Sequence, residues 1–332
     1  MSRDAILITG ITGQLGMALS KRLNERKERV VCFIRKPRNE YPRDFGGLEL
    51  LEADLTDRRA VFAYAKQLKD RIGTVVHMAG LPDGHPRKVL RENIYEASIS
   101  MYEFANEIGC PKFIYLSSIL AAGPVPHDRA FIDEGFDPPS SRLCYFGKMK
   151  LKTEKKLKEL SDHSMTKTVM IRPGNIYGQP KLSFIKFVSR LIMKRNRVFY
   201  QRAKRSAMWS PVHTQDVIDC IFRLLDESAF DGKTYFLTAG RKVTLEEVTG
   251  IICDALGVPL ADMEELTSFE KGHLALRKAI DFCRGLSGRP SFPDYVYSND
   301  SIRRDLGFLP KVGLRDGIIE TVDWAKNEGL LS

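Results

Sequence analysis

The chain has 332 residues, of which 43% are hydrophobic and 28% are charged, a composition that fits a globular protein and excludes a disordered or fibrous chain. No apolar run is long enough to cross a membrane and a strand-like run begins near residue 5, so we expect a cytoplasmic protein with no signal peptide and no membrane partner. The formal net charge of +10 lies largely in local runs typical of solvated faces, without an aromatic-interleaved RNA motif, so we expect no nucleic-acid partner.

The six cysteines are scattered along the chain, and none of them forms a CxxC pair. Buried free thiols in a reducing compartment fit this pattern better than disulfides or a zinc site. No group of His, Cys and Asp residues has the spacing of metal ligands, so we expect no metal ion. His77, at the end of a strand-like run, is expected to be a satisfied core histidine.

A glycine-rich turn stands between an apolar run at 5–8 and a helical run marked by leucines at 15, 19 and 23. In this context Gly10 allows a tight turn, Gly13 lets the backbone approach a pyrophosphate, and Gly16 lets the helix pack closely on the strand. The free N–H groups and the positive dipole end at the helix start would hold the phosphates. A purely structural turn in another α/β protein is the alternative.

Strand-like and helical runs alternate along the first half of the chain. Strands are expected at 5–8, 29–35, 48–52, 74–80, 112–118 and 167–172, and helices at about 15–23, 87–108 and 141–161. This alternation predicts an α/β protein with a doubly wound parallel sheet, the Rossmann architecture, whose crossovers are right-handed.

The alternation becomes irregular beyond about residue 178. Helices are expected at 184–194, 216–227, 244–256, 265–284 and 314–327, with a last strand at 234–237. We therefore predict that residues 1–178 form the Rossmann domain and that 212–240 rejoin it. Residues 179–211 and 241–332 would form a smaller C-terminal lobe that binds the substrate.

Several short motifs follow one another along nearly the whole chain. They are Thr9-Gly10-x-x-Gly13-x-x-Gly16, Asp54-Leu55, His77-x-Ala79, Asn93, Ser117-Ser118, Lys150-x-x-x-Glu154, Arg172-Pro173-Gly174-Asn175-Ile176-Tyr177-Gly178, His213-x-x-Asp216-Val217 and Leu306-Gly307-Phe308-x-Pro310. With this series the chain resembles the extended short-chain dehydrogenase/reductases, which include the NAD(P)-dependent epimerase/dehydratases. The resemblance implies an NAD(P)-dependent enzyme, and a homodimer that pairs through the helices at about 87–108 and 141–161.

The end of the second strand distinguishes the two nicotinamide cofactors. An acidic residue there would bind the ribose 2′-hydroxyl of NAD, but this chain has Arg35 and Lys36 at that point. Cations suit a 2′-phosphate, which arginine can grip with two hydrogen bonds, so we expect NADP rather than NAD. A solvated basic loop is the alternative.

The resemblance also assigns individual contacts to the cofactor. Asp54 would bond to the adenine amine and the Leu55 amide to a ring nitrogen, although aspartate here is also a common helix cap, for which Asp57 is a candidate. Asn93 would support the active site or satisfy buried backbone groups, and residues 173–176 would face the nicotinamide. The expected contacts are Gly10, Thr12, Gly13, Gln14, Leu15, Gly16, Arg35, Lys36, Asp54, Leu55, Met78, Ala79, Gly80, Asn93, Lys150, Pro173, Gly174, Asn175 and Ile176.

Hydride transfer to a carbonyl needs a proton donor and a group that polarises the oxygen. The family uses a serine or threonine, a tyrosine as acid/base, and a lysine four residues later that lowers the tyrosine pKa and holds the ribose. Ser118 matches the serine, with Ser117 as the other candidate, and Lys150 matches the lysine because Glu154 follows at the usual distance. The residue four before the lysine is Phe146, which neither donates nor accepts a proton.

Phe146 departs from the family pattern, and three explanations stay open. The first is that phenylalanine was introduced in place of a tyrosine by engineering. The second is that the natural protein uses another acid, such as Tyr145, or a step that needs none. The third is that the protein binds its cofactor without catalysis. Tyr145 lies about 100° around the helix from Phe146, so it serves only if the helix begins irregularly. The intact Ser118 and Lys150 favour an enzyme over a non-catalytic NADP-binding regulator.

The residue at position 209 indicates the substrate class. Sugar-nucleotide members of the family carry an arginine just before the strand that leads to His213, and this chain has Trp209 there. An indole does not clamp a diphosphate, but it would line a more apolar pocket or lie in the core of the lobe. We therefore expect a small non-nucleotide alcohol or ketone that contacts Ser118 and Trp209. A sugar-nucleotide epimerase or dehydratase is the alternative.

Overall fold

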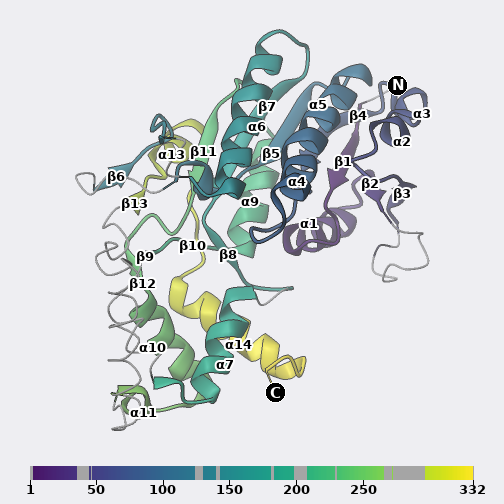
Figure 1. Ribbon diagram of the computed structural model, residues 1–332. Coiled ribbons are helices and arrows are strands. Elements are labelled where there is room, and N and C mark those ends of the chain that lie inside the picture. Colours follow the sequence, from purple (N-terminus) through teal and green to yellow (C-terminus); the bar gives the residue numbers. More distant parts are fainter. Residues whose placement is uncertain are drawn as a thin grey trace.

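The computed structural model of the protein describes residues 3–35, 45, 47–123, 130–139, 143–180, 183–197, 208–228, 230–264, 271 and 296–331. It has two parts, a sheet domain with helices on both faces and a smaller, mainly helical lobe at one end (Figure 1). Lys36 and nearly all of the helix expected at 265–284 lie outside the described residues.

The sheet domain is built on seven parallel strands in the order β11-β7-β5-β4-β1-β2-β3. They are β1 (Ala5–Thr9), β2 (Val30–Ile34), β3 (Glu49–Glu52), β4 (Ile72–His77), β5 (Lys112–Leu116), β7 (Lys167–Pro173) and β11 (Thr234–Leu237). The chain leaves β1 towards β2 on one side and returns to β4 on the other, so the strand order reverses beside β1. The predicted doubly wound sheet is confirmed, and its switch point is where such folds bind ligands.

Helices cover both faces of the sheet over two apolar cores. The leucines at 15, 19 and 23 lie in one of these cores, as their helical spacing predicts. The helices on that face are α1 (Gln14–Glu25), α9 (Thr214–Leu225) and α13 (Asp300–Leu306), and those on the other face are α2 (Arg58–Phe62), α3 (Ala65–Leu68), α5 (Ala97–Glu107) and α6 (Tyr145–Asp162).

The helix expected at 87–108 is present but is not uniform. It consists of α4 (Arg87–Leu90), a π-helical segment η3 (Arg91–Glu96), and α5. Wider π turns are often found at functional sites because they change the direction of the side chains that follow. This one brings Asn93 to the carboxyl end of the sheet.

The smaller lobe has its own apolar core, which holds Trp209 and residues from four helices. Its elements are α7 (Ser183–Met193), β9 (Met208–Trp209), β12 (Val243–Thr244), α10 (Leu245–Leu256), α11 (Ala261–Glu264) and α14 (Leu314–Asn327). Strands β9 and β12 pair in antiparallel fashion. Two further strand pairs were not expected from the sequence. They are β8 (Asn175–Tyr177) with β10 (Pro211–His213) and β6 (Phe131–Ile132) with β13 (Val296–Tyr297).

The C-terminal stretch contributes to both parts of the molecule. Strand β11 joins the sheet beside β7, in the stretch 212–240 that was expected to rejoin it. Helix α13 packs into the core under the sheet, so the lobe expected at 241–332 is interrupted by a segment that returns to the sheet domain. Asp216 in α9 accepts hydrogen bonds from the amides of residues 311–312, which fixes the chain on its way to α14.

No helix in the described part of the chain combines the length and the apolar character needed to cross a bilayer. The five cysteines in this part are free thiols, and all but Cys144 are buried. Within the same residues no cluster of three or more His, Cys, Asp or Glu side chains could hold a metal ion. The homodimer through α5 and α6 remains a prediction.

Candidate active site

The glycine-rich turn joins β1 to α1 at the carboxyl end of the sheet. Gly10 has a φ of +76°, a left-handed conformation that glycine adopts readily. A Cβ at this position would lie 2.8 Å from the backbone nitrogen of Ala79, and a Cβ on Gly16 would lie 2.2 Å from the carbonyl oxygen of Gly10. Backbone atoms fill both spaces, so the turn requires glycine where α1 meets the ends of β1 and β4.

Gly13 is the N-cap residue of α1, and no side chain caps the first turn of this helix. Its amide groups are therefore oriented to bind an anion, which the helix dipole also favours. They adjoin a pocket of about 790 Å³ at the ends of β1, β2 and β4. The expected cofactor contacts in its wall are Gly10, Thr12, Gly13, Arg35, Asp54, Leu55, Met78, Ala79, Gly80 and Asn93. The crowded glycine cradle fits the close approach of a dinucleotide pyrophosphate.

The side chains at the start of α1 have structural roles. Gln14 Nε2 donates to the carbonyl of Gly178 at 2.8 Å and to Thr214 Oγ1 at 2.9 Å, which links α1 to the start of α9. Leu15 is buried in the core under the sheet, and Gly16 packs against the turn. Contact of these three residues with a cofactor remains a prediction, for which their backbone amides are the natural groups.

One end of the pocket is lined by polar residues from the ends of β2 and β3. Arg35 directly follows β2 and is exposed at the pocket wall. Asp54 is exposed as well, and its Oδ1 accepts hydrogen bonds from the amide and the hydroxyl of Thr56, at 2.9 and 2.8 Å. Asp57 caps α2 by accepting two hydrogen bonds from its first amides. With the capping role taken by Asp57, Asp54 faces the pocket.

His77, at the end of β4, connects the glycine turn to the π segment. Its Nδ1 lies 2.8 Å from Thr9 Oγ1, and its Nε2 lies 2.9 Å from Ser98 Oγ. Ser98 donates its own proton to the Ile94 carbonyl at 2.6 Å, so Nε2 carries the ring proton and Thr9 donates to Nδ1. Thr9 Oγ1 in turn accepts from the Ala79 amide at 3.2 Å. Burial lowers the pKa of His77 to about 3, which makes it the neutral core histidine expected from the sequence.

Asn93 lies in the π segment η3 and lines the pocket. Its Nδ2 donates to the carbonyl of Val89 at 3.0 Å. The residue therefore satisfies a helix carbonyl and also contributes to the pocket wall, so the two roles considered for it from the sequence are compatible.

The two serines that follow β5 have different surroundings. Ser117 is buried, and its hydroxyl bonds to the carboxylate of Glu154. Ser118 is half-buried, and its Oγ accepts a hydrogen bond of 3.1 Å from an amide of the 3₁₀ turn η4 (Ile119–Ala121). Because Ser118 acts as an acceptor in this cap, its hydroxyl proton can be donated to a substrate oxygen, which favours Ser118 over Ser117 as the polarising residue.

Lys150, from α6, is buried beside the pocket wall. Its Nζ donates to the Leu116 carbonyl at 2.7 Å and lies 4.7 Å from the centre of the Tyr115 ring. A Cβ on the pocket-lining Gly80 would be 4.0 Å from this nitrogen. Burial lowers the pKa of Lys150 to about 8, while the charge of Glu154 acts in the opposite direction. The lysine thus lies behind the pocket wall with an ammonium group that titrates close to neutrality.

Phe146 lies one helical turn before Lys150, with its ring centre 5.9 Å from Nζ. Its ring and the pocket-lining Leu81 pack against one apolar cluster. Tyr145 is the first residue of α6 and packs against the same cluster, with the Arg87 guanidinium 5.5 Å above its ring. Since α6 is regular from Tyr145 onward, the irregular start that would turn this phenol towards Lys150 is not present.

The turn after β7 is built for close packing. A Cβ on Gly174 would lie 2.0 Å from the Ser210 carbonyl oxygen, and Asn175 Oδ1 accepts from the Ser210 amide at 3.3 Å. Contact between residues 173–176 and the nicotinamide remains a prediction.

Trp209 is 6% exposed, and its ring centre is 5.6 Å from that of Tyr177 in the lobe core. Trp209 therefore lies in the core of the lobe, which is one of the two roles considered for it from the sequence. Contact between Trp209 and a substrate remains a prediction.

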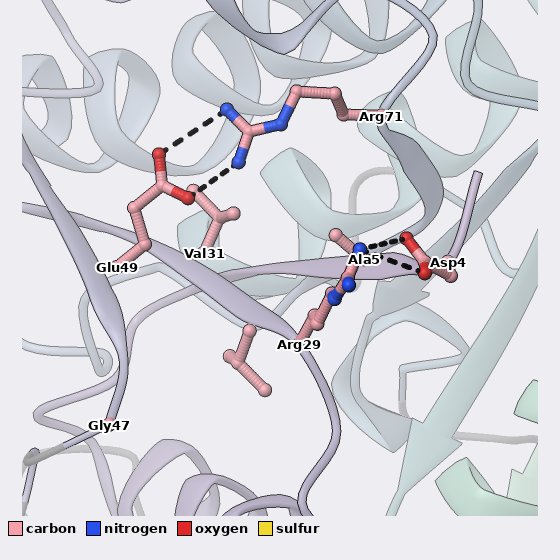
Figure 2. Close-up of a pocket in the computed structure, with 8 residues that line it drawn as sticks. Asp4, Ala5, Arg29, Val31, Gly47, Glu49 and Arg71 are labelled. Carbon is pink, nitrogen blue, oxygen red and sulfur yellow. Dashed lines mark hydrogen bonds and ion pairs between the residues drawn. The ribbon is translucent and has the colours of Figure 1, made fainter. Parts of the chain in front are cut away.

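A second pocket, of about 490 Å³, lies at the opposite edge of the sheet, where β1, β2 and β3 begin (Figure 2). Arg71 forms two hydrogen bonds with Glu49, and Arg29 pairs with Asp4 at 3.1 Å. Each arginine is matched by a carboxylate, so this pocket offers no excess positive charge to a phosphate. The pocket at the glycine turn is therefore the better candidate for a dinucleotide.

Comparison with known proteins agrees with this geometry. The NAD dependent epimerase/dehydratase family matches residues 6–237, from the first to the last strand of the sheet. The chain belongs to this family. Membership of the epimerase/dehydratase family confirms the resemblance expected from the ordered motifs.

Characterised relatives match this chain along nearly its full length. It is 30% identical to sterol demethylase protein B of Methylococcus capsulatus, over 98% of this chain and 99% of that protein. It is 22% identical to the decarboxylating sterol-4-alpha-carboxylate 3-dehydrogenase of Candida albicans (98% and 99%) and 24% identical to the 2-alkyl-3-oxoalkanoate reductase of Stenotrophomonas maltophilia (94% and 97%). These names, with the family match, identify an NAD(P)-dependent enzyme.

Solved structures with the same fold match nearly the whole chain. UDP-glucose 4-epimerase of Thermotoga maritima, solved with UDP-glucose, matches with a TM-score of 0.76 at 16% identity, over 98% of this chain and 99% of that chain. MoeE5, in complex with UDP-glucuronic acid and NAD, matches with a TM-score of 0.73 at 20% identity, over the same shares. The likeness extends through both the sheet domain and the lobe.

Proposed function

We propose that this epimerase/dehydratase family member is an NADP(H)-dependent oxidoreductase of the extended short-chain type, which interconverts a secondary alcohol and a ketone on a small non-nucleotide substrate. The observation that supports it best is the position of Ser118 and Lys150 at the end of β5, beside the strand whose end lines the glycine-turn pocket. A polarising hydroxyl and a cofactor-holding cation would then act at one place.

The residues of the pocket fit a dinucleotide cofactor. The glycine turn and the first amides of α1 would hold its pyrophosphate, Asp54 and Leu55 its adenine, and Lys150 the ribose next to the nicotinamide. When bound, the nicotinamide supplies or accepts the hydride. Arg35 supports NADP over NAD, because a guanidinium at the end of β2 suits a 2′-phosphate, whereas NAD would call for a carboxylate there.

The substrate class is inferred from position 209 and from the relatives. Trp209 replaces the arginine with which sugar-nucleotide members of the family clamp a diphosphate. Relatives of this chain are named for a sterol, a sterol-4-alpha-carboxylate and a 2-alkyl-3-oxoalkanoate. All three names describe largely apolar molecules, and the last two indicate reaction at a secondary alcohol or a ketone. We infer a substrate of this apolar kind.

The roles of the protein side chains follow from their surroundings. Ser118 would donate a hydrogen bond to the substrate oxygen and polarise it. Lys150 would hold the cofactor ribose. Phe146 cannot transfer a proton, and the loss of a positioned acid typically slows a reaction by about 10²–10⁴. We therefore propose slow turnover in this chain.

Each of two alternatives is favoured by one observation. The structural likeness to UDP-glucose 4-epimerase favours a sugar-nucleotide epimerase or dehydratase. Phe146 favours a regulator that binds NADP without catalysis.

Calorimetric titration of NADPH and NADH, followed by turnover assays, tests the proposal against both alternatives. The assays offer 3-hydroxysteroids, 3-ketosteroids, 2-alkyl-3-oxoalkanoates and UDP-glucose to the protein and to its F146Y variant. We expect tighter binding of NADPH, and turnover of an apolar alcohol or ketone that is faster in the variant. Turnover of UDP-glucose alone would support the epimerase, and NADPH binding without turnover in either protein would support the regulator. Failure to bind either cofactor would overturn the assignment of the pocket.

A further inference from the structure

Three ionisable side chains are buried together beside the candidate active site. Lys150 is 6% exposed, Glu154 is 4% exposed and Arg172 is 5% exposed. The first two lie one turn apart in α6, and Arg172 lies in the adjacent strand β7. When all three are ionised, the group carries one excess positive charge, which is costly in a buried place unless every charge is well compensated.

Glu154 is the one carboxylate of this group, and two neighbours share it. Arg172 Nη2 lies 2.6 Å from Oε2, and its Nε lies 3.0 Å from Oε1. The hydroxyl of Ser117 bonds to Oε1 as well. The remaining nitrogen of the guanidinium, Nη1, is buried and has no hydrogen-bond partner among the described residues. Arg172 and Ser117 together thus hold both oxygens of the Glu154 carboxylate.

Ser117 connects the Glu154 carboxylate to the turn that contains Ser118. Its hydroxyl is held by Glu154, and its amide donates to the Ile171 carbonyl of β7 at 2.7 Å. Ser117 is thus held through both its hydroxyl and its amide, and the next residue, the half-buried Ser118, is the N-cap of the turn η4.

The hydrogen bond of Lys150 goes to the carbonyl of Leu116, while the charge of Glu154, one helical turn away, raises the pKa of the lysine against the effect of burial. Titratable groups face the lysine from each neighbouring element: His77 on β4, Tyr115 on β5 and Glu154 on α6, with Arg172 on β7 behind the carboxylate. Burial lowers the pKa of His77 and raises the pKa of Tyr115, so both are neutral near pH 7. Glu154 alone in this set supplies a negative charge to the lysine.

We propose that Glu154 is a positioning residue of the active site, which keeps Lys150 protonated and, through Ser117, fixes the turn that presents Ser118. The proposal rests on the proposed function only in taking Lys150 and Ser118 as the groups that meet cofactor and substrate.

The charges predict shifts of opposite sign for two substitutions. Glu154→Gln removes the negative charge and leaves the Lys150 and Arg172 cations, so the lysine loses its proton at lower pH. Arg172→Gln removes the competing cation and leaves the carboxylate to the lysine, which then keeps its proton to higher pH. A loss of packing alone would not shift the Lys150 titration in opposite directions in the two variants.

The experiment follows the titration of Lys150 in the cofactor-free protein by NMR of ¹³Cε-labelled lysine, with the signal assigned from a Lys150→Arg variant. We expect Glu154→Gln to lower the midpoint by about one pH unit or more, and Arg172→Gln to raise it. Ser117→Ala, which removes the hydroxyl and leaves all charges, should move it by less than about 0.3 unit. Glu159→Gln, an exposed change on the same helix, is the matched control and should leave it unchanged.

A midpoint that is the same in Glu154→Gln and in the parent protein would overturn the proposal, as would shifts of the same sign in both charge variants. If Arg172→Gln does not fold, the comparison of Glu154→Gln with Ser117→Ala and Glu159→Gln still decides the question. The pH dependence of NADPH binding separates this proposal from the proposed function. A shift of the lysine titration in a protein that binds no NADPH would support the role of Glu154 and refute the cofactor assignment.

Discussion

The ammonium group of Lys150 lies 5.9 Å from the centre of the Phe146 ring, one helical turn away. An aromatic ring can face a cation in this way whether or not it bears a hydroxyl group. Phe146 therefore packs beside the lysine as a tyrosine would, but it supplies no acid. The hydroxyl group that distinguishes tyrosine from phenylalanine at this position should consequently affect proton transfer but not cofactor binding.

Phe146→Tyr should raise turnover of the oxidoreductase by about 10²–10⁴, because it restores a phenol beside the Lys150 ammonium. The dissociation constant for NADPH should change by less than about threefold, since the ring is already in place. Steady-state kinetics and calorimetry measure the two quantities. Tyr145→Phe in the F146Y background is the control and should leave the restored rate intact. A rate that collapses in this double variant would instead identify Tyr145 as the acid.

Arg35→Glu should weaken NADPH binding by at least about tenfold, because it places a carboxylate against the 2′-phosphate. NADH binding should be unchanged or stronger, since a carboxylate can accept from a 2′-hydroxyl. Calorimetric titration of both cofactors measures the ratio. Arg59→Glu makes the same change of charge at an exposed site outside the pocket wall and should leave the ratio unaltered. Equal losses in both variants would show that only the net charge matters.

The glycines of the turn should respond differently to replacement by alanine. A Cβ on Gly13 would lie 3.1 Å from the Gly10 carbonyl oxygen, so Gly13→Ala should fold with a modest loss of stability but bind NADPH at least about tenfold more weakly. Gly16→Ala should destabilise the protein by several kcal/mol, about the upper range for point substitutions, because its Cβ meets backbone atoms. Thermal unfolding and calorimetry distinguish these two effects.

Gly250 provides the control for these glycine substitutions. It lies within α10, and among the described residues no atom outside the neighbouring helix backbone lies within 4 Å of a Cβ at this position. Gly250→Ala should therefore stabilise the protein by up to about 1 kcal/mol through helix propensity and leave NADPH binding unchanged. Full NADPH affinity in Gly13→Ala, measured beside this control, would argue against a phosphate at the turn.

The neutral His77 predicts that stability falls in mild acid. Its pKa is lowered from 6.5 to about 3 by burial, so below pH 6.5 the unfolded chain binds a proton that the folded protein does not. The stabilising contribution is complete above about pH 7 and decreases by up to about 1.4 kcal/mol per pH unit below pH 6. Urea denaturation at pH 7.0 and 5.5 should show about 1 kcal/mol more loss in the parent protein than in His77→Gln. Equal losses would mean that His77 becomes protonated within the fold.

Local sequence was sufficient for the main elements of the fold. The apolar runs and the glycine turn predicted the sheet because each of these signals lies within a few neighbouring residues. Sequence periodicity did not reveal the π segment Arg91–Glu96, where the helix continues without a change in composition. The two-residue strands and α13 were missed as well, because elements this short have no periodicity and depend on long-range partners.

The candidate site was predictable to a similar degree. Ten of the expected cofactor contacts line one pocket, since the family motifs mark strand ends that a parallel sheet brings together. The bonds of Glu154 to Arg172 and Ser117 were not foreseen, although all three residues stood within recognised motifs. The hydrogen bonds that join His77 to the hydroxyls of Thr9 and Ser98 were also missed. Such contacts join residues far apart in sequence, and the motif spacings give their identity but not their pairing.

Helix α13 has a consequence for the synthesis of the protein. Its residues Ile302 and Leu306 complete the apolar core on the face of the sheet that α1 and α9 also cover. A ribosome must therefore translate the chain through Leu306 before this face can close. Until then the nascent chain carries an exposed apolar surface, which makes it a natural client for chaperones, and any truncation upstream of residue 300 would leave that surface open permanently.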